Sequence, residues 1–491
     1  MLKPRLLWVG YTGSEGSSHF EVVQKLKKAE LVDFFVATGV TNKSDKWKLV
    51  DEPVVSHSDA LFAKYESFIS DSKFLMDQEI YLLCASFEGE TLRMMDRLHR
   101  RGPTLIFNDS FDTRRKMFLS HCSFWYQYLL EKKISHVMFF AVPHEVYTFV
   151  IYSLAKKLNL KIIIFSPEKS GPFRNKKILE VGKRGFTSMM DSTFFVAEDI
   201  EDIGKWRLST SLNLIAKELG INLSRSTELF NRNAIYQVAQ PSVGNSSVYR
   251  KSVKKMYKRV LRIISDYKKS IETLSYWVKS RLRYREHLSL AKSSDSASKS
   301  VLFCLAYQPE ESTSPRGGIF VEQLLAIELL SVGLPEGWKL RVREHPDQYS
   351  RLRARPKNFL KDISEIQNVE IVPPGETVLE SFNASSAVAI TSGTMGVEAW
   401  VAGIPTIVFG EIWIKNAPGA YYVRSLNDVR EALLRISEGV QSSEHTIEGF
   451  LTWTESHAFS GRIKRIDSHE AELREVTVEN IFNILRVWFV A

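Results

Sequence analysis

The chain has 491 residues, with 66 Lys and Arg against 57 Asp and Glu, and therefore a formal net charge of +9. This length predicts two or three domains, and a composition with 44% hydrophobic and 25% charged residues argues against wholesale disorder, collagen-like repeats and coiled coil. The three cysteines, Cys84, Cys122 and Cys304, stand far apart without a Cys-x-x-Cys pair. This pattern excludes a disulfide framework or a cysteine-based zinc site and fits a reducing compartment.

The first half of the chain alternates short β-rich runs with amphipathic stretches of helical period. Such alternation predicts a parallel, doubly wound sheet. The expected strands are Leu6–Val9, Asp33–Ala37, Ile80–Ala85, Thr104–Phe107, His136–Phe140 and Lys161–Phe165. The expected helices are His19–Ala29, Glu90–Arg101, Phe118–Glu131 and Glu145–Leu158.

The second half repeats this alternation after residue 300. It predicts strands at Val301–Ala306, Lys339–Arg343, Val369–Val372, Val388–Ile390 and Thr406–Phe409, with helices at Phe320–Leu330 and Val397–Ala402. We therefore expect an α/β protein of two Rossmann-like domains. The expected domains are 1–240 and 301–475, joined by a linker at 241–300 and followed by a C-terminal helix, 476–491, that packs back on the body.

The linker contains the whole basic excess of the protein. Residues 250–292 hold 14 Lys and Arg against three acids, so the segment carries +11, and the remaining 52 basic and 54 acidic residues carry −2. Apolar residues recur in it at three- and four-residue spacing, which predicts an amphipathic helix. Its Trp and Tyr side chains beside basic ones suit an anionic membrane surface. A solvated linker that packs its apolar stripe on the domains is an equal alternative, and nucleic-acid binding is disfavoured because no nucleic-acid motif surrounds the segment.

No apolar run approaches the roughly 18 residues of a membrane span. The first ten residues have too short an apolar run for a signal peptide and are expected to form a strand. We therefore expect a cytoplasmic protein, with any membrane association peripheral, at the inner face of the plasma membrane.

Three predicted strand ends in the second half carry polar residues suited to an anionic ligand, because ligands of open α/β sheets bind beyond the carboxyl ends of strands. The loop 307–318 contains two glycines that permit close backbone approach and precedes a helix. In the Arg-Glu-His-Pro run 343–346, the histidine follows a predicted strand and is able to donate a hydrogen bond to a phosphate oxygen. The run 391–399 is the strongest, since a Ser/Thr/Gly loop opens a helix there, although capping alone would explain its hydroxyls. The candidates are Gln308, Glu310, Gly317, Gly318, Glu344, His345, Ser392, Gly393, Thr394, Gly396 and Glu398.

The first half offers candidates for the catalytic acid, base or nucleophile. Carboxylates and a histidine follow predicted strands in two places, and these residues are Asp109, Asp112, His144 and Glu145. Because carboxylates at strand ends are commonly helix caps, the spacing does not decide which of the four acts.

The motifs at 307–318, 343–346 and 391–399 together resemble those of the bacterial capsule polysaccharide biosynthesis proteins. That family is similar to the Kdo transferases, to bacterial sialyltransferases and to other GT-B glycosyltransferases, with two Rossmann-like domains facing across a cleft. The resemblance implies that His345, Ser392 and Thr394 hold the phosphate of a CMP-sugar. It also implies a base in the N-terminal domain, for which Asp109 occupies a plausible strand end. A similar Glu in UDP-sugar enzymes holds the ribose, which implies that role for Glu398 and leaves the donor base open.

The resemblance implies a glycosyltransferase that moves a sugar from a nucleotide donor onto a surface polysaccharide or lipid-linked glycan. No metal or other cofactor is expected, because hydrogen bonds from the site would stabilise the leaving phosphate. Two alternatives are a nucleotide-sugar epimerase on the same fold and a non-catalytic member of a capsule assembly complex.

Overall fold

A computed structural model of the chain describes residues 3–10, 17–39, 55–65, 76–95, 110–166, 193–223, 267–292, 299–308, 310–350, 355, 358–439, 443–461 and 471–490. These residues form two compact units. The first unit comprises the described parts of Met1–Ser170, Lys183–Asn231 and Leu451–Ala491, and the second lies within Arg232–Phe450. The boundary falls inside helix α17 (Glu444–Glu455), so the C-terminal part of the chain belongs to the first unit.

The first unit is built on a six-stranded sheet with the order β14-β7-β6-β5-β1-β2. The four strands from β6 to β2 run parallel, β7 is antiparallel to β6, and β14 is antiparallel to β7. The chain reverses direction across the sheet between β1 and β5, which are neighbours and lead to opposite edges. The strands are β1 (Arg5–Val9), β2 (Asp33–Val36), β5 (His136–Phe139), β6 (Lys161–Ser166), β7 (Thr193–Ala197) and β14 (Phe459–Ser460).

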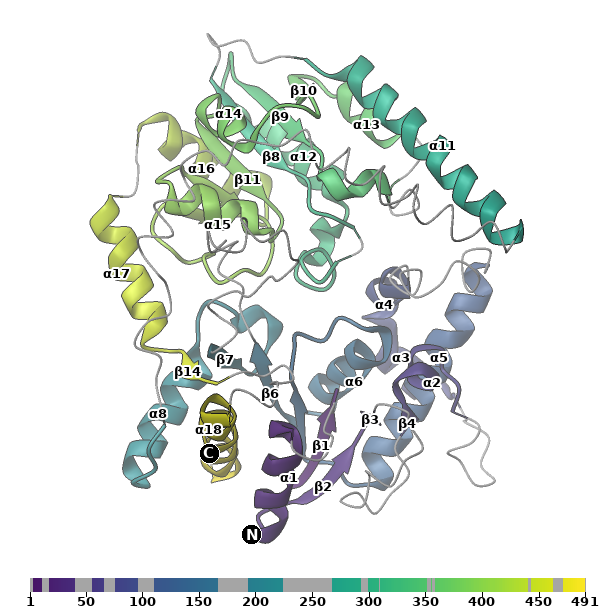
Figure 1. The fold of residues 1–491 in the computed structure, drawn as a ribbon, viewed down its shortest axis with the longest axis vertical. Coiled ribbons are helices and arrows are strands. Elements are labelled where there is room, and N and C mark those ends of the chain that lie inside the picture. Colours follow the sequence, from purple (N-terminus) through teal and green to yellow (C-terminus); the bar gives the residue numbers. More distant parts are fainter. Residues whose placement is uncertain are drawn as a thin grey trace. The chain divides into compact units, whose positions relative to one another are not determined.

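Three helices from distant parts of the sequence cover one side of this sheet (Figure 1). They are α1 (Ser18–Lys28), α8 (Arg207–Glu218) and α18 (Ala471–Val490), and α18 contacts both of the others. Alternate residues of the strands, such as Leu6 and Trp8, enter the same buried cluster as Leu26 and Ile481. The C-terminal helix is therefore an integral part of the core of the first unit.

The remaining helices of the first unit pack among themselves and against α6 (Val146–Lys157). They are α2 (His57–Leu61), α3 (Gln78–Ala85), α4 (Glu88–Met94) and α5 (Phe111–Glu131), beside a small parallel pair of strands, β3 (Thr38–Gly39) and β4 (Val55–Ser56). The predicted strand at Ile80–Ala85 is wrong, because the Asp77 side chain accepts a hydrogen bond from the Ile80 N–H at 2.8 Å and caps a helix there. The predicted strand at Thr104–Phe107 lies outside the described residues.

The second unit contains a six-stranded, all-parallel sheet with the order β10-β9-β8-β11-β12-β13. Numbered from the first of its strands, this is the order 3-2-1-4-5-6 of a Rossmann fold. The strands are β8 (Ser300–Cys304), β9 (Lys339–Arg343), β10 (Val369–Ile371), β11 (Ala387–Ile390), β12 (Thr406–Val408) and β13 (Ala420–Tyr422). The predicted class, α/β with two Rossmann-like domains, is confirmed.

The helices of the second unit follow its strands as the crossovers require. After β8 come η5 (Gly318–Val321) and α12 (Gln323–Gly333), after β9 come η6 (Pro346–Ser350) and α13 (Phe359–Ser364), and α14 (Val378–Asn383), α15 (Thr394–Val401) and α16 (Leu426–Ser437) follow later strands. The helical character predicted for the basic linker is confirmed for α11 (Tyr267–Leu290), which contacts η6 and α13. None of the described helices combines the length and apolar composition needed to cross a bilayer.

Two buried histidines make the stability of the first unit depend on pH. Burial lowers the pKa of His121 to about 3, and burial with the nearby Lys161 lowers that of His136 to about 4, against 6.5 unfolded. The His121 Nδ1 lies 2.7 Å from the hydroxyl of Tyr65, which in turn accepts from the Trp125 indole at 2.9 Å. The unfolded chain therefore binds more protons as the pH falls below 6.5.

We expect stability to be complete above pH 6.5 and to fall as the pH is lowered from there toward the folded-state pKa values. Between pH 7 and pH 5 the free energy of unfolding should decrease by about 2 kcal/mol for each imidazole. Urea unfolding at both pH values measures this change. The His121→Gln variant removes one titrating group, so an unchanged pH dependence in that variant would contradict the assignment to His121.

Candidate functional site

The switch point of the second sheet lies between β8 and β11, where the strand order reverses. Because all six strands are parallel, their carboxyl ends share one edge, and a ligand of such a sheet binds outside the switch point. At this edge, β8 is followed by the loop 307–318 and β11 by the loop 391–393. Both loops belong to the polar runs that were predicted from the sequence to bind an anionic ligand. β9 flanks β8 on the other side, so the His345 loop lies about 10 Å from the β11 loop by strand spacing.

The loop after β8 is held in place by its own side chains. The Gln308 side-chain amide donates to the Val321 carbonyl at 2.5 Å, and its backbone N–H donates to the Gln348 side chain at 2.9 Å. The Glu310 carbonyl accepts from the Thr313 hydroxyl at 2.9 Å in a turn. These contacts give Gln308 and Glu310 a structural role in fixing the loop.

Gly317 is required by the packing of the chain itself. A Cβ at Gly317 would lie 2.5 Å from the Thr313 carbonyl oxygen and 2.9 Å from the Thr391 side chain. Gly410 is equally confined, since a Cβ there would lie 2.6 Å from the Arg316 carbonyl oxygen. The loops after β8, β11 and β12 are therefore in direct backbone contact. Ligand approach is not needed to explain Gly317, whereas the neighbouring Gly318 has φ +52 and an open Cβ position.

The loop after β9 rests on a buried ion pair. Arg355 Nε lies 2.9 Å from Glu344 Oε2, and Arg355 Nη2 donates to Glu344 Oε1 at 2.9 Å, with both side chains at most 4% exposed. Glu344 Oε1 also accepts from the backbone N–H of His345 at 2.7 Å. The His345 ring is half-buried and lies 5.3 Å from the ring of Tyr307, measured between centroids. Glu344 is thus a positioning group for His345.

The loop after β11 leads into helix α15, whose start was predicted from the sequence to bind an anion. Gly393 is the N-cap residue of α15, no side chain caps the helix, and a Cβ on Gly393 would meet no atom within 4 Å. The Thr394 side chain is exposed, and Ser392 is buried and donates to the Ser312 carbonyl. The first turn of α15 therefore presents backbone N–H groups beside an open position.

Two other candidate residues of this helix, Gly396 and Glu398, lie further along it than its open first position. Gly396 does not make room for a ligand, because a Cβ there would lie 2.2 Å from Ile390 Cδ1 and so faces the sheet. The glycine instead allows α15 to pack closely on β11. Glu398 is the fifth residue of α15 and stands in its second turn. Burial raises the pKa of the Cys304 thiol at the end of β8 to about 12; the charge of Arg343 opposes this rise and that of Glu398 adds to it.

A buried charged cluster at the ends of β12 and β13 was not predicted from the sequence. The Lys415 ammonium pairs with the Glu411 carboxylate, and both side chains are at most 8% exposed. The Tyr422 hydroxyl donates to Glu411 at 2.5 Å, and the guanidinium of Arg424 donates to that hydroxyl at 2.6 Å. The four-residue spacing of Glu411 and Lys415 is the one signal in the sequence, and it equally fits an exposed helical pair.

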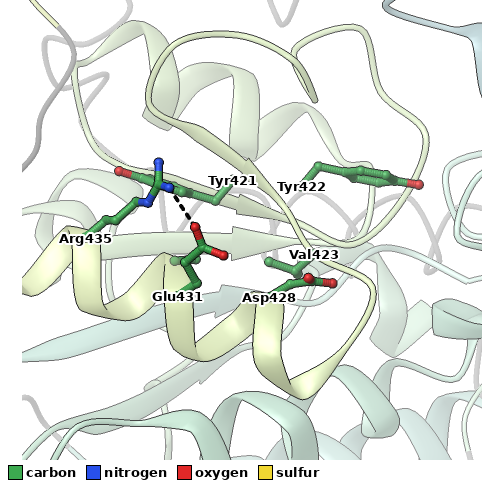
Figure 2. A pocket seen from close by; sticks show the side chains of 7 residues that line it. Tyr421, Tyr422, Val423, Asp428, Glu431 and Arg435 are labelled. Atoms are coloured by element: carbon green, nitrogen blue, oxygen red, sulfur yellow. Dashed lines mark hydrogen bonds and ion pairs between the residues drawn. The ribbon is translucent and has the colours of Figure 1, made fainter.

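A small hollow lies beside this cluster (Figure 2). It has a volume of about 180 Å³ and is lined by β13 and α16, with Tyr421 and Tyr422 on one side and Asp428 and the paired Glu431 and Arg435 on the other. None of the predicted site residues lines it, and it is smaller than the roughly 300 Å³ of the smallest typical ligand pockets.

The first unit places two of the predicted catalytic residues at its own switch point. His144 and Glu145 follow β5, next to β1. The His144 Nδ1 donates to the Val142 carbonyl at 2.6 Å, and Glu145 is the N-cap residue of α6, with its N–H donating to Thr148 at 3.1 Å. Asp112 is exposed in the first turn of α5. Asp109 lies outside the described residues.

A second group of polar side chains gathers near this edge from three separate segments. The Tyr147 hydroxyl lies 2.9 Å from His57 Nδ1 and 3.0 Å from the Thr38 hydroxyl. Tyr147 and Thr38 are buried, whereas His57 is half-exposed at the start of α2. A hydrogen-bonded, partly exposed imidazole is able to accept a proton, so His57 joins the candidates for a general base. No residue spacing in the sequence pointed to His57. Among the described residues, no three His, Cys, Asp or Glu side chains gather as metal ligands.

No protein-family model and no curated protein matches the chain. Solved structures to which it is similar include the UDP-GlcNAc 2-epimerase of Methanocaldococcus jannaschii in complex with UDP-GlcNAc and UDP, with 12% identity and a TM-score of 0.26 over 99% of this chain and 100% of that one. Two others are transferases of Thermosulfurimonas dismutans KpsC. The β-Kdo 2,4 transferase has 12% identity and a TM-score of 0.25 over 65% of this chain and 87% of that one. The β-Kdo 2,7 transferase has 11% identity and a TM-score of 0.26 over 73% and 94%.

Proposed function

We propose that the protein is a glycosyltransferase that moves a sugar from a nucleotide donor onto a surface polysaccharide or lipid-linked glycan. The observation that carries this proposal is the start of α15 at the switch point of the second sheet. There Gly393 leaves an open position in front of backbone N–H groups, and the exposed Thr394 stands beside it. This arrangement suits the phosphate groups of a nucleotide.

In the proposed reaction the second unit stabilises the leaving nucleotide. The N–H groups of α15 and its helix dipole act on the phosphate charge that develops as the glycosidic bond breaks. His345, fixed by Glu344, donates a further hydrogen bond, and Glu398 accepts hydrogen bonds from the ribose hydroxyls. The proposal assigns this charge stabilisation to protein groups and requires no metal ion.

The first unit supplies the group that activates the acceptor. A base removes the proton of the attacking hydroxyl, or a carboxylate attacks the anomeric carbon if configuration is retained. The candidates are Asp109, Asp112, His144 and Glu145 from the sequence and His57 from the structure. The motifs resemble those of CMP-sugar enzymes, so we propose a CMP-sugar as the donor.

Binding of CMP, CDP, UDP and GDP, measured by calorimetry on the full chain, tests the donor site. We expect one nucleotide, CMP by preference, to bind, and Gly393→Ala to weaken binding at least about tenfold because its methyl group occupies the open position. Gly449→Ala, at a helix position where a Cβ also meets no atom within 4 Å, is the matched control. A folded chain that binds none of the four nucleotides would refute the proposal and favour a non-catalytic assembly protein.

Incubation with a nucleotide sugar separates the transferase from an epimerase. A transferase leaves the sugar configuration of the donor unchanged and needs an acceptor for turnover. Conversion of the donor sugar to its epimer without an acceptor would contradict transfer and establish the alternative activity on the same fold.

A further inference from the structure

Helix α11, the described part of the basic linker, has one face fixed to the second unit. The His287 Nε2 donates to the Val372 carbonyl at 2.7 Å, and its Nδ1 is hydrogen-bonded to the Tyr349 hydroxyl. Arg283 donates to the Arg355 carbonyl at 3.1 Å. His287 is 1% exposed, so this side of the helix is part of the folded unit.

The segment after α11 secures the helix at its C-terminal end. Ala291 pairs in parallel with Ile371 of β10, and the Lys292 N–H donates to the Ile371 carbonyl at 2.9 Å. β10 is an edge strand of the second sheet, so the chain extends that edge directly after the helix. The orientation of α11 within the second unit is therefore set by contacts at its inner face and by this strand pairing.

The opposite face of α11 combines exposed aliphatic and basic side chains. Val278, Leu282 and Leu288 are 43%, 56% and 51% exposed. Lys279, Arg281 and Arg285 are exposed around them. Val278 and Leu282 are four residues apart, and in the sequence Leu274 and Ile271 continue their spacing toward the start of the helix. The inner contacts use other positions, so they do not explain this stripe.

We propose that this outer face of α11 binds an anionic phospholipid surface, an inference that does not depend on the nucleotide site. The helix sequence carries the two features of an interfacial helix, apolar side chains that enter the headgroup region and basic ones beside them that pair with lipid phosphates. The +11 charge of residues 250–292 complements an anionic membrane, whereas the rest of the protein is near neutral at −2. A protein partner would need matching acidic groups as well as an apolar groove, and a nucleic acid would leave the aliphatic stripe uncovered.

Co-sedimentation of the full chain with vesicles tests this proposal. We expect binding at low salt to vesicles of equal parts phosphatidylcholine and phosphatidylglycerol, and weaker binding to phosphatidylcholine alone. Leu282→Asp, or Arg281→Glu with Arg285→Glu, should weaken binding at least about tenfold, since each basic residue near the surface contributes about 1 kcal/mol. Matched controls are Leu434→Asp and Arg430→Glu on α16, where Leu434 is 57% exposed, and these should bind as the wild type does.

Three outcomes would overturn the proposal. The first is no binding to the anionic vesicles at low salt, and the second is binding that Leu282→Asp leaves unchanged. The third is preferential binding of a nucleic-acid duplex that displaces the vesicles, which would assign the basic face to nucleic acid. The urea unfolding curve of Leu282→Asp, measured in parallel, shows whether the variant is folded, so this test stays separate from that of the donor site.

Discussion

Replacing Arg355 by Met should lower the free energy of unfolding of the second unit by about 3–5 kcal/mol, because it leaves the Glu344 carboxylate buried without its counter-ion. The two side chains are 3% and 4% exposed and are joined at 2.9 Å through both Nε and Nη2. Methionine keeps much of the length and apolar contact of the arginine stem, so the loss comes mainly from the charge. Urea unfolding measures it, with hydrogen exchange of β9 peptides to assign the transition to the second unit.

The matched control is Arg435→Met, since Arg435 also pairs with a glutamate, Glu431, at 2.6 Å, but with side chains 58% and 63% exposed. Water screens that pair, and we expect a change within about 0.5 kcal/mol. The double variant Arg355→Met with Glu344→Gln should recover part of the loss because no uncompensated charge remains. Equal losses of unfolding free energy in Arg355→Met and Arg435→Met would show that burial does not determine how much the Arg355–Glu344 pair stabilises the second unit.

The parallel sheets were predictable because most of their strands are short apolar runs, such as Ala387–Ile390, or alternate apolar with charged residues, as Lys339–Arg343 does. Lys339–Arg343 was predicted with its observed bounds, and the other strands predicted in the second half differ from the observed ones by one or two residues at their ends. Ile80–Ala85 shows where this kind of prediction fails. A short apolar run fits a strand or a helix equally well, and here the Asp77 side chain caps a helix. The short β13 and β14 have two or three residues each, and only pairing with a distant strand makes them strands.

The edge of the sheet at which the candidate site lies was predicted from the sequence, but the role of each residue at that edge was not. Loops after parallel strands share one edge, so the runs at 307–318, 343–346 and 391–399 were expected to meet there. Whether a glycine faces a ligand or the protein depends on where its missing Cβ would point. At Gly393 that position is open, and at Gly396 it is filled by Ile390. Tyr147 contacts His57 and Thr38, which come from two other segments of the chain, and no residue spacing in the sequence predicts such a contact.

Loss of His345 should lower turnover strongly under the proposed function. His345 stands on the loop after β9, with its backbone fixed by the buried Glu344. Under the proposed function its imidazole donates to the leaving phosphate, a contact that strengthens as negative charge develops. Removing one such donor typically costs about 100-fold or more in turnover. We therefore expect His345→Ala to lose at least that much activity while keeping the unfolding curve of the wild type, because the ring is only half-buried.

His345→Gln separates the donor role from simple loss of volume. Its amide can still donate a hydrogen bond, so it should retain more activity than His345→Ala, although it lacks any imidazolium charge. His445→Ala on α17 removes an exposed histidine of the second unit away from the strand ends and should be as active as the wild type. A folded His345→Ala variant with near-normal turnover would remove His345 from the mechanism, and the α15 N-terminus would then carry the phosphate charge without it.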